Sequence, residues 1–153
     1  MELGGIYMIE WDETKNEKCL DMLQRLLAFS SSEGIYFTEI EQILNTGYLL
    51  QEVREEQSNQ NATVSDRIAT SSPYIGLSFR GLTSGEMMNE ILKSLKMNHC
   101  KGTFYVTSQE MIQEENIIRK IIREGHEIGL GGVTKRDMRQ CSWQEQVKKI
   151  KKE

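Results

Sequence analysis

The sequence is poor in the residues that mark several common classes of protein. Its three cysteines, Cys19, Cys100 and Cys141, form no CxxC pair, so a disulfide framework is unsupported and a reducing compartment is the default expectation. The longest apolar runs span only a few residues, far short of the ~20 that a membrane-spanning helix needs. We therefore expect no membrane insertion. Hydrophobic residues still make up 38% of the 153 residues, which is enough for a core and excludes a wholly disordered chain.

Charge is unevenly distributed along the chain. Residues 1–50 carry three Lys/Arg against nine Asp/Glu, whereas residues 73–153 carry fourteen against ten. The basic run at 148–152 could contact phosphates, but no stacking aromatic residues are interleaved with it, and a solvated helix end explains it better. We therefore expect no nucleic-acid partner. The acidic front and the mildly basic back suggest two pieces of different origin.

The first piece, residues 1–50, has the pattern of a βαβα segment. Short apolar runs at 5–9 and 35–37 predict buried strands. Apolar spacing of three and four residues predicts a helix over 14–29 with Met22 among its inward side chains, and a short helix follows over 39–44. The polar stretch at 51–73, which closes on the only proline, Pro73, predicts a flexible linker and a module boundary.

The second piece, residues 74–153, predicts a βαβαβα segment. Strands are expected at 74–79, 102–106 and 127–130, and helices at 86–97, 111–123 and 143–152. The helix over 111–123 is expected to direct Ile117, Ile118, Ile121 and Ile122 inward. This alternation predicts an α/β fold with parallel strands and outer helices, in which functional groups follow the carboxyl ends of the strands.

Three motifs of the second piece carry a family resemblance. IGLSFRGL (75–82), KGTFYV (101–106) and EGHEIG (124–129) resemble the ALTFDDGP, KATFFV and EGHEIGNHTxxH patterns of the polysaccharide deacetylase family, carbohydrate esterases with a NodB-homology domain. The resemblance covers residues 74 to 135 and implies a deacetylase-like (β/α) barrel, here incomplete. Residues 74–153 resemble the opening part of such a domain. Residues 1–50 resemble its closing part, but more weakly.

The resemblance also implies a chemistry. The family hydrolyses N-acetyl amide (C–N) bonds with a divalent metal such as zinc, held by one Asp and two His, while a second Asp is the base and a His near the last strand is the acid. The corresponding positions here are Arg80 (base), Gly81 (metal Asp), Gly131 and Lys135 (metal His), and Glu10 or Trp11 (last-strand His).

Every chemical position therefore departs from the family pattern, while scaffold residues such as Phe79, Phe104 and His126 are kept. The pattern favours a catalytically inactive deacetylase-like protein, a pseudoenzyme without a metal, that binds a glycan or a partner in the groove where Arg80, Lys135 and Arg136 supply positive charge. Two alternatives stay open. One is an active metal-dependent deacetylase completed by another chain, and the other is a structural or interaction module.

Two other groups of residues receive structural interpretations. His126 precedes the third strand of its segment, and we expect it to be partly buried and structural rather than catalytic. The acidic pair Glu114–Glu115 is expected to lie on a solvated helix face.

The order of the two pieces is inverted with respect to the family. The chain is either the middle of a protein with two tandem domains or a permuted half-barrel, in which the first piece pairs with the second in one sheet. An unclosed sheet leaves edges open, which predicts self-association. The start, MELGGIYMIEW, does not resemble a signal peptide, whereas members of the family often act outside the membrane, so cytoplasmic location is only the default expectation.

Overall fold

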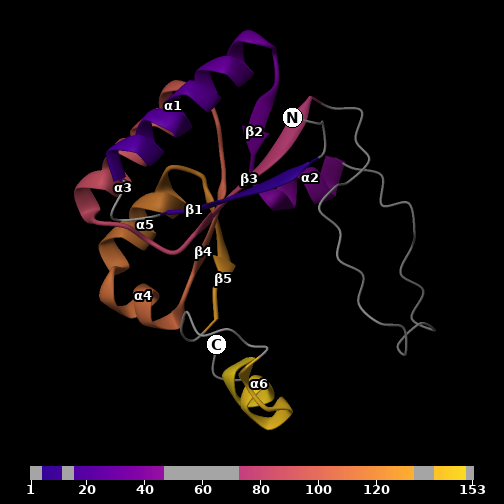
Figure 1. The fold of residues 1–153 in the computed structure, drawn as a ribbon, viewed down its shortest axis with the longest axis vertical. Coiled ribbons are helices and arrows are strands. Elements are labelled where there is room, and N and C mark those ends of the chain that lie inside the picture. The colour runs from indigo at the N-terminus through magenta and orange to yellow at the C-terminus, as the bar shows by residue number, and fades with distance from the viewer. Residues whose placement is uncertain (1–4, 12–15, 47–72, 133–139, 151–153) are drawn as a thin grey trace, which may run out of the picture.

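A computed structural model describes residues 5–11, 16–46, 73–132 and 140–150 of the chain (Figure 1). Within these residues a five-stranded parallel sheet is flanked by helices. The strands are β1 (Ile6–Glu10), β2 (Tyr36–Thr38), β3 (Tyr74–Arg80), β4 (Thr103–Val106) and β5 (Glu127–Leu130). The helices are α1 (Asn16–Ser32), α2 (Ile40–Thr46), α3 (Gly85–Met97), α4 (Ser108–Gln113), α5 (Glu115–Arg123) and α6 (Trp143–Ile150).

The sheet joins the two pieces of the chain. Its order is β1-β3-β4-β5, and β1 runs parallel to β3 with Ile6 opposite Gly76 and Glu10 opposite Arg80. The short β2 pairs with the first three residues of β3, and the carbonyl oxygen of Phe37 accepts a hydrogen bond from Lys101 N just before β4. The first piece therefore packs on the second, as the half-barrel interpretation expects, and the carboxyl ends of β1, β3, β4 and β5 meet at one edge.

Helices α1, α3 and α5 cover one face of the sheet (Figure 1). Their buried side chains pack on alternate residues of β3 and β4, because side chains on a strand point to one face at every second position. Phe79 and Phe104 stack at the centre with ring centroids 4.6 Å apart. The core members from the helices are Leu23, Leu27, Met88, Ile91, Leu92, Leu95, Ile118 and Ile121.

On the other face, α2 covers only the beginning of the sheet. A Cβ on Gly76 would lie 3.1 Å from Ile43 Cδ1 and 3.2 Å from Ile6 Cγ1, so the glycine lets Ile43 approach the strand. Thr103 anchors the helix start, since its Oγ1 accepts from Ile40 N at 2.8 Å and donates to Glu127. The strands described here do not close, which confirms an incomplete barrel.

The element predictions are confirmed with small shifts of their ends, except at 111–123. Two helices, α4 and α5, replace the single predicted helix. Thr107 and Glu110 form a reciprocal capping box that starts α4 earlier, and the backbone of Glu114 (φ −117°, ψ 37°) separates the two helices.

The strand expected to be buried at 5–9 is instead partly exposed, with Tyr7 at 39% and Met8 at 58%, because β1 lies at the edge of the described sheet.

Two inward side-chain predictions are wrong. Ile122 and Met22 are each 57% exposed, because α5 and α1 bury narrower stripes than the apolar spacing suggests. Most of the predicted linker, at 51–72, lies outside the described residues, and so does the whole of 133–139, which contains Lys135 and Arg136. Of the helices that are described, none combines the length and apolar character required to cross a bilayer.

Candidate binding site at the strand ends

An ion pair lies where β1 and β3 end. Glu10 and Arg80 occupy paired positions, and Glu10 Oε1 lies 3.8 Å from Arg80 Nη1. Both side chains are well exposed, at 75% for Glu10 and 53% for Arg80. Trp11 packs against the core instead, and its Nε1 donates to Asn16 Oδ1 at 2.5 Å. Of the two sequence candidates for the last-strand position, Glu10 is therefore the one beside Arg80.

Gly81, at the position of the family's metal Asp, has a backbone that favours glycine. Its φ of +78° lies in the left-handed region, where a Cβ strains the chain. Its N–H donates to the carbonyl oxygen of Tyr105 at 2.8 Å, which holds the turn against β4. An aspartate at this position would have an unfavourable backbone conformation.

Gly131, at the position of the first metal His, is packed against backbone. A Cβ placed on it would lie 2.8 Å from both C and O of Val106, closer than real Cβ contacts allow. Gly131 N also donates to Val106 O at 2.7 Å, so the two segments are held at this separation. A side chain of any kind at this position requires the backbone after β4 or β5 to move.

The residues present therefore do not fit the metal that the family uses. Gly81 and Gly131 have no ligand side chain, and their backbones are unfavourable for one. Within the residues that the structure describes, no three His, Cys, Asp or Glu side chains cluster in a way that could hold a metal ion. Lys135, at the second His position, and Arg136 belong to the part of the chain that is not described.

His126 is a structural residue, as predicted. It is 7% exposed, its Nδ1 accepts a hydrogen bond from Gly102 N at 3.3 Å, and its ring packs edge-on against Phe104. Burial, together with the nearby positive charge of Lys101, lowers the pKa of His126 to about 4. Lys101 in turn donates its Nζ to the carbonyl oxygen of Glu124. The retained motifs KGTFYV and EGHEIG thus join β4 to β5. These contacts are structural and do not depend on a catalytic activity.

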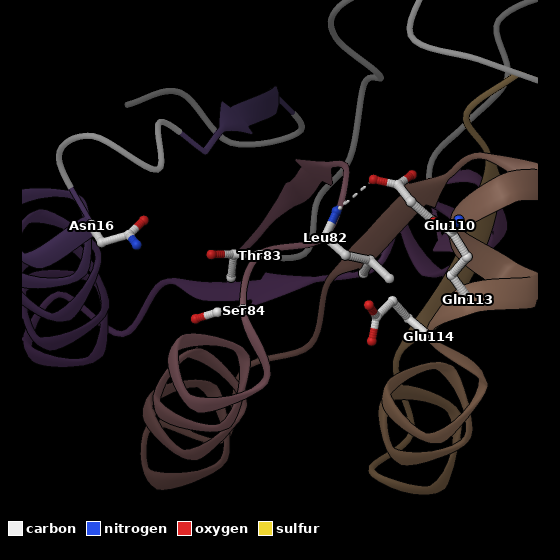
Figure 2. A pocket seen from close by; sticks show the side chains of 7 residues that line it. All are labelled: Asn16, Leu82, Thr83, Ser84, Glu110, Gln113 and Glu114. Atoms are coloured by element: carbon white, nitrogen blue, oxygen red, sulfur yellow. Dashed lines mark hydrogen bonds between the residues drawn. The ribbon is translucent and has the colours of Figure 1, made fainter.

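A pocket of about 460 Å³ opens next to the end of β3 (Figure 2). Its lining comes from the start of α1, the turn after β3, and α4 with the residue that follows it: Asn16, Leu82, Thr83, Ser84, Glu110, Gln113 and Glu114. The sequence motifs did not indicate this pocket, because none of these side chains stands at a position that is catalytic or metal-binding in the family. The prediction that Glu114 lies on a plain solvated helix face is incomplete, since Glu114 also lines the pocket.

Comparisons with known proteins agree with this geometry. The sequence model of the polysaccharide deacetylase family matches residues 67–153, and the chain belongs to this family. Its fold is similar to that of the Streptococcus pyogenes deacetylase PplD, solved in complex with acetate, with a TM-score of 0.64 at 15% sequence identity. That similarity covers 96% of this chain and 63% of PplD, so the chain spans less than two thirds of its length. No match is found among curated protein sequences.

Proposed function

We propose that this protein is a non-catalytic member of the polysaccharide deacetylase family that binds a glycan at the carboxyl ends of its strands. The ligand would lie over Arg80, with Lys135 and Arg136 from the following segment adding positive charge. A glycan is favoured because the family acts on polysaccharides and because the scaffold motifs around these strand ends are kept.

The main support for the proposal that catalysis is absent comes from the backbone around Gly131. A substitution that merely replaced a ligand would leave room for the lost side chain, but here the space is filled by the backbone of Val106. Gly81, with its positive φ, repeats the pattern at a second ligand position. At both of these ligand positions the backbone disfavours any side chain. This supports the proposal that the protein is adapted to function without the metal.

Arg80 has the chemistry to bind a sugar. Its guanidinium presents several N–H donors in a plane, and these match the hydroxyl and acetamido oxygens of a saccharide. The Arg80 side chain is 53% exposed, and Glu10 at 3.8 Å orients it without burying it. A ligand oxygen can therefore approach Arg80 without desolvating a buried pair.

A titration with an N-acetylated glucosamine oligosaccharide, followed by calorimetry, tests the binding. We expect Arg80→Ala to weaken binding about tenfold, the effect of losing hydrogen bonds from a charged donor. Arg25→Ala is the matched control, because Arg25 is an exposed arginine paired with Asp21 on α1. Equal binding by both variants, or no saccharide binding by the wild-type chain, would contradict the proposal.

The absence of catalysis has a separate test. We expect no acetate release from the same oligosaccharide, with or without added zinc, and none after incubation with a cell extract that could supply a missing chain. Zinc-dependent acetate release by the chain alone would overturn the proposal, and release only in the extract would favour a deacetylase completed by a partner.

An interaction module is a second candidate, and the edge of the sheet favours it. β1 is the last strand on its side within the described sheet, and its Met8 and Tyr7 are 58% and 39% exposed. Edge strands with exposed apolar side chains are prone to pair with another chain. A second copy of this chain, adding its own β1, is the partner that we propose.

A further inference from the structure

The pocket beside β3 contains a buried hydroxyl without a partner. Thr83 is 6% exposed, and its Oγ1 makes no hydrogen bond within the described part of the chain. Burying a hydroxyl without a partner is unfavourable, because the group loses its hydrogen bonds to water, so such groups are rare in folded proteins. In Figure 2 the Thr83 hydroxyl points toward the Asn16 side of the pocket. A ligand hydroxyl at this place would satisfy it.

Asn16 and Ser84 extend this polar side of the pocket. Asn16 Oδ1 accepts from Trp11 Nε1, so the amide nitrogen is left to donate, and it faces the pocket in Figure 2. Ser84 caps the start of α3, and its Oγ accepts from Met87 N at 3.5 Å. Together with Thr83, they give this side of the pocket both donors and acceptors, which match the adjacent hydroxyl groups of a sugar ring.

The opposite side of the pocket is acidic, but its two carboxylates differ. Glu110 is held by Thr107 N at 2.8 Å and by Leu82 N at 3.2 Å, so it serves to fix the loop after β3. The carboxylate of Glu114 makes no hydrogen bond or ion pair with the described residues, and Figure 2 shows it directed into the pocket. Glu114 is therefore the charged group that a ligand would meet.

These features narrow the class of ligand. None of the lining residues is Lys, Arg or His, so an anion would be repelled by Glu110 and Glu114. A bound divalent cation requires more oxygen ligands than the one free carboxylate provides. A neutral sugar would satisfy Thr83 and Asn16 but would form no charge-assisted bond with Glu114. A sugar with an ammonium group satisfies both sides.

We propose that this pocket binds an amino sugar with a free ammonium group, which pairs with Glu114 while ring hydroxyls bond to Thr83 and Asn16. The pocket volume, about 460 Å³, is within the range of small-molecule sites. The inference rests on the proposed function for the class of ligand, because Leu82 of the pocket follows Arg80 by two residues, so a glycan bound over Arg80 would pass near the pocket. It assigns this protein a preference for deacetylated over acetylated saccharides in a site separate from Arg80.

Binding of a glucosamine oligosaccharide by the full chain, measured by calorimetry at a pH where the amine is protonated, tests the inference. We expect Glu114→Gln to weaken binding about tenfold, as for the loss of a charge-assisted bond. Glu115→Gln is the matched control, because Glu115 is the adjacent acidic residue but pairs with Arg119 at 2.6 Å outside the pocket. It should bind as tightly as the wild type.

Thr83→Val adds a readout that a merely structural role would not give. The variant removes the unpartnered hydroxyl and keeps the shape, so the free protein should melt at a higher temperature while ligand binding falls about fivefold. Higher stability with unchanged binding would overturn the inference, and so would lower stability with unchanged binding.

The outcomes separate this inference from the proposed function. If Arg80→Ala reduces binding of the N-acetylated oligosaccharide but Glu114→Gln and Thr83→Val leave glucosamine binding unchanged, the pocket proposal fails and the strand-end site stands. If the wild type binds only the glucosamine oligosaccharide, and through Glu114, the strand-end site fails. Equal affinity for acetylated and free-amine oligosaccharides would also overturn the proposed preference.

Discussion

Glu10 and Arg80 face each other across two strands that belong to different pieces of the chain, with 3.8 Å between their charged groups. The pairing places an acidic and a basic side chain at the edge where the carboxyl ends of the parallel strands meet. Both residues stand at positions that the family resemblance links to catalysis, an acid on the last strand and a base on the first. The described site therefore presents a solvated ion pair in their place.

This ion pair should contribute little to stability. Exposed pairs are screened by solvent and contribute about 0–1 kcal/mol, so Glu10→Gln and Arg80→Gln should each change the free energy of unfolding by less than about 1 kcal/mol. A double-mutant cycle by urea denaturation measures the coupling. A coupling above about 2 kcal/mol would mean that the pair is a structural element, and the proposed binding role of Arg80 would need another explanation.

The fold could be predicted from the sequence because its signals are local or repeated. The apolar runs predicted the strands that hold Phe79 and Phe104, two retained scaffold residues that lie in the core, and His126 of EGHEIG was expected just before β5. The early start of α4 was missed, although Thr107 and Glu110 have the spacing of a capping box. That local signal could have been found.

The site was harder to predict, because its features depend on contacts between distant segments. Gly131 reads as a loop glycine in the sequence, and only the approach of the Val106 backbone shows why a side chain does not fit. The pocket brings Asn16 from α1 together with Glu114 from the end of α4, and no spacing in the sequence relates them. Arg80 alone of the three predicted binding residues can be placed.

His126 should make the stability of the protein depend on pH. Its pKa is about 4 in the folded protein, below the usual 6.5, so at intermediate pH the unfolded chain binds a proton that the folded chain does not. Stability is then complete above about pH 6.5 and falls as the pH drops toward 4. The full effect is on the order of 3 kcal/mol.

Urea denaturation between pH 4 and pH 7.5 measures this dependence. His126→Gln should lower the stability at pH 7.5, because it disturbs the contacts with Gly102 and Phe104, and should flatten the slope below pH 6.5. His99→Gln is the control, since His99 is exposed, and it should keep the wild-type slope. An unchanged slope in His126→Gln would show that other groups cause the acid sensitivity.

Substitutions at Gly131 should reveal how closely the backbone is packed. A Cβ at this position meets backbone atoms at 2.8 Å, so Gly131→Ala should destabilise the protein by about 1–3 kcal/mol. Gly85→Ala is the matched control, because its Cβ would meet only Ile117 Cδ1 at 3.9 Å at the start of α3, and it should be neutral or stabilising by up to about 1 kcal/mol.

The same position tests whether the metal site can be restored. The double variant Gly81→Asp, Gly131→His supplies two of the family's ligand types, and we expect it to be less stable than the wild type and not to gain melting temperature on addition of zinc. A ligand that binds only the folded state raises its stability, so the shift with zinc is a direct readout. A clear zinc-dependent rise would show that the backbone at Gly81 and Gly131 adapts readily to ligand side chains.

The open edge at β1 should cause self-association. Met8 is 58% exposed on a strand at the edge of the described sheet, and pairing with β1 of a second copy would cover it. Light scattering on a size-exclusion column should give a mass that rises above 17.7 kDa with concentration. Met8→Lys should restore the monomer, because a charge on an edge strand opposes pairing.

The matched control for this prediction is Met97→Lys. Met97 is 72% exposed but ends α3, away from the edge strand, so the same substitution there should leave association unchanged. Equal effects of both variants would indicate association through general apolar surface rather than through the edge. A wild-type mass of 17.7 kDa at every concentration would show that the sheet is stable with its edge uncovered, and the interaction candidate would then lose its support.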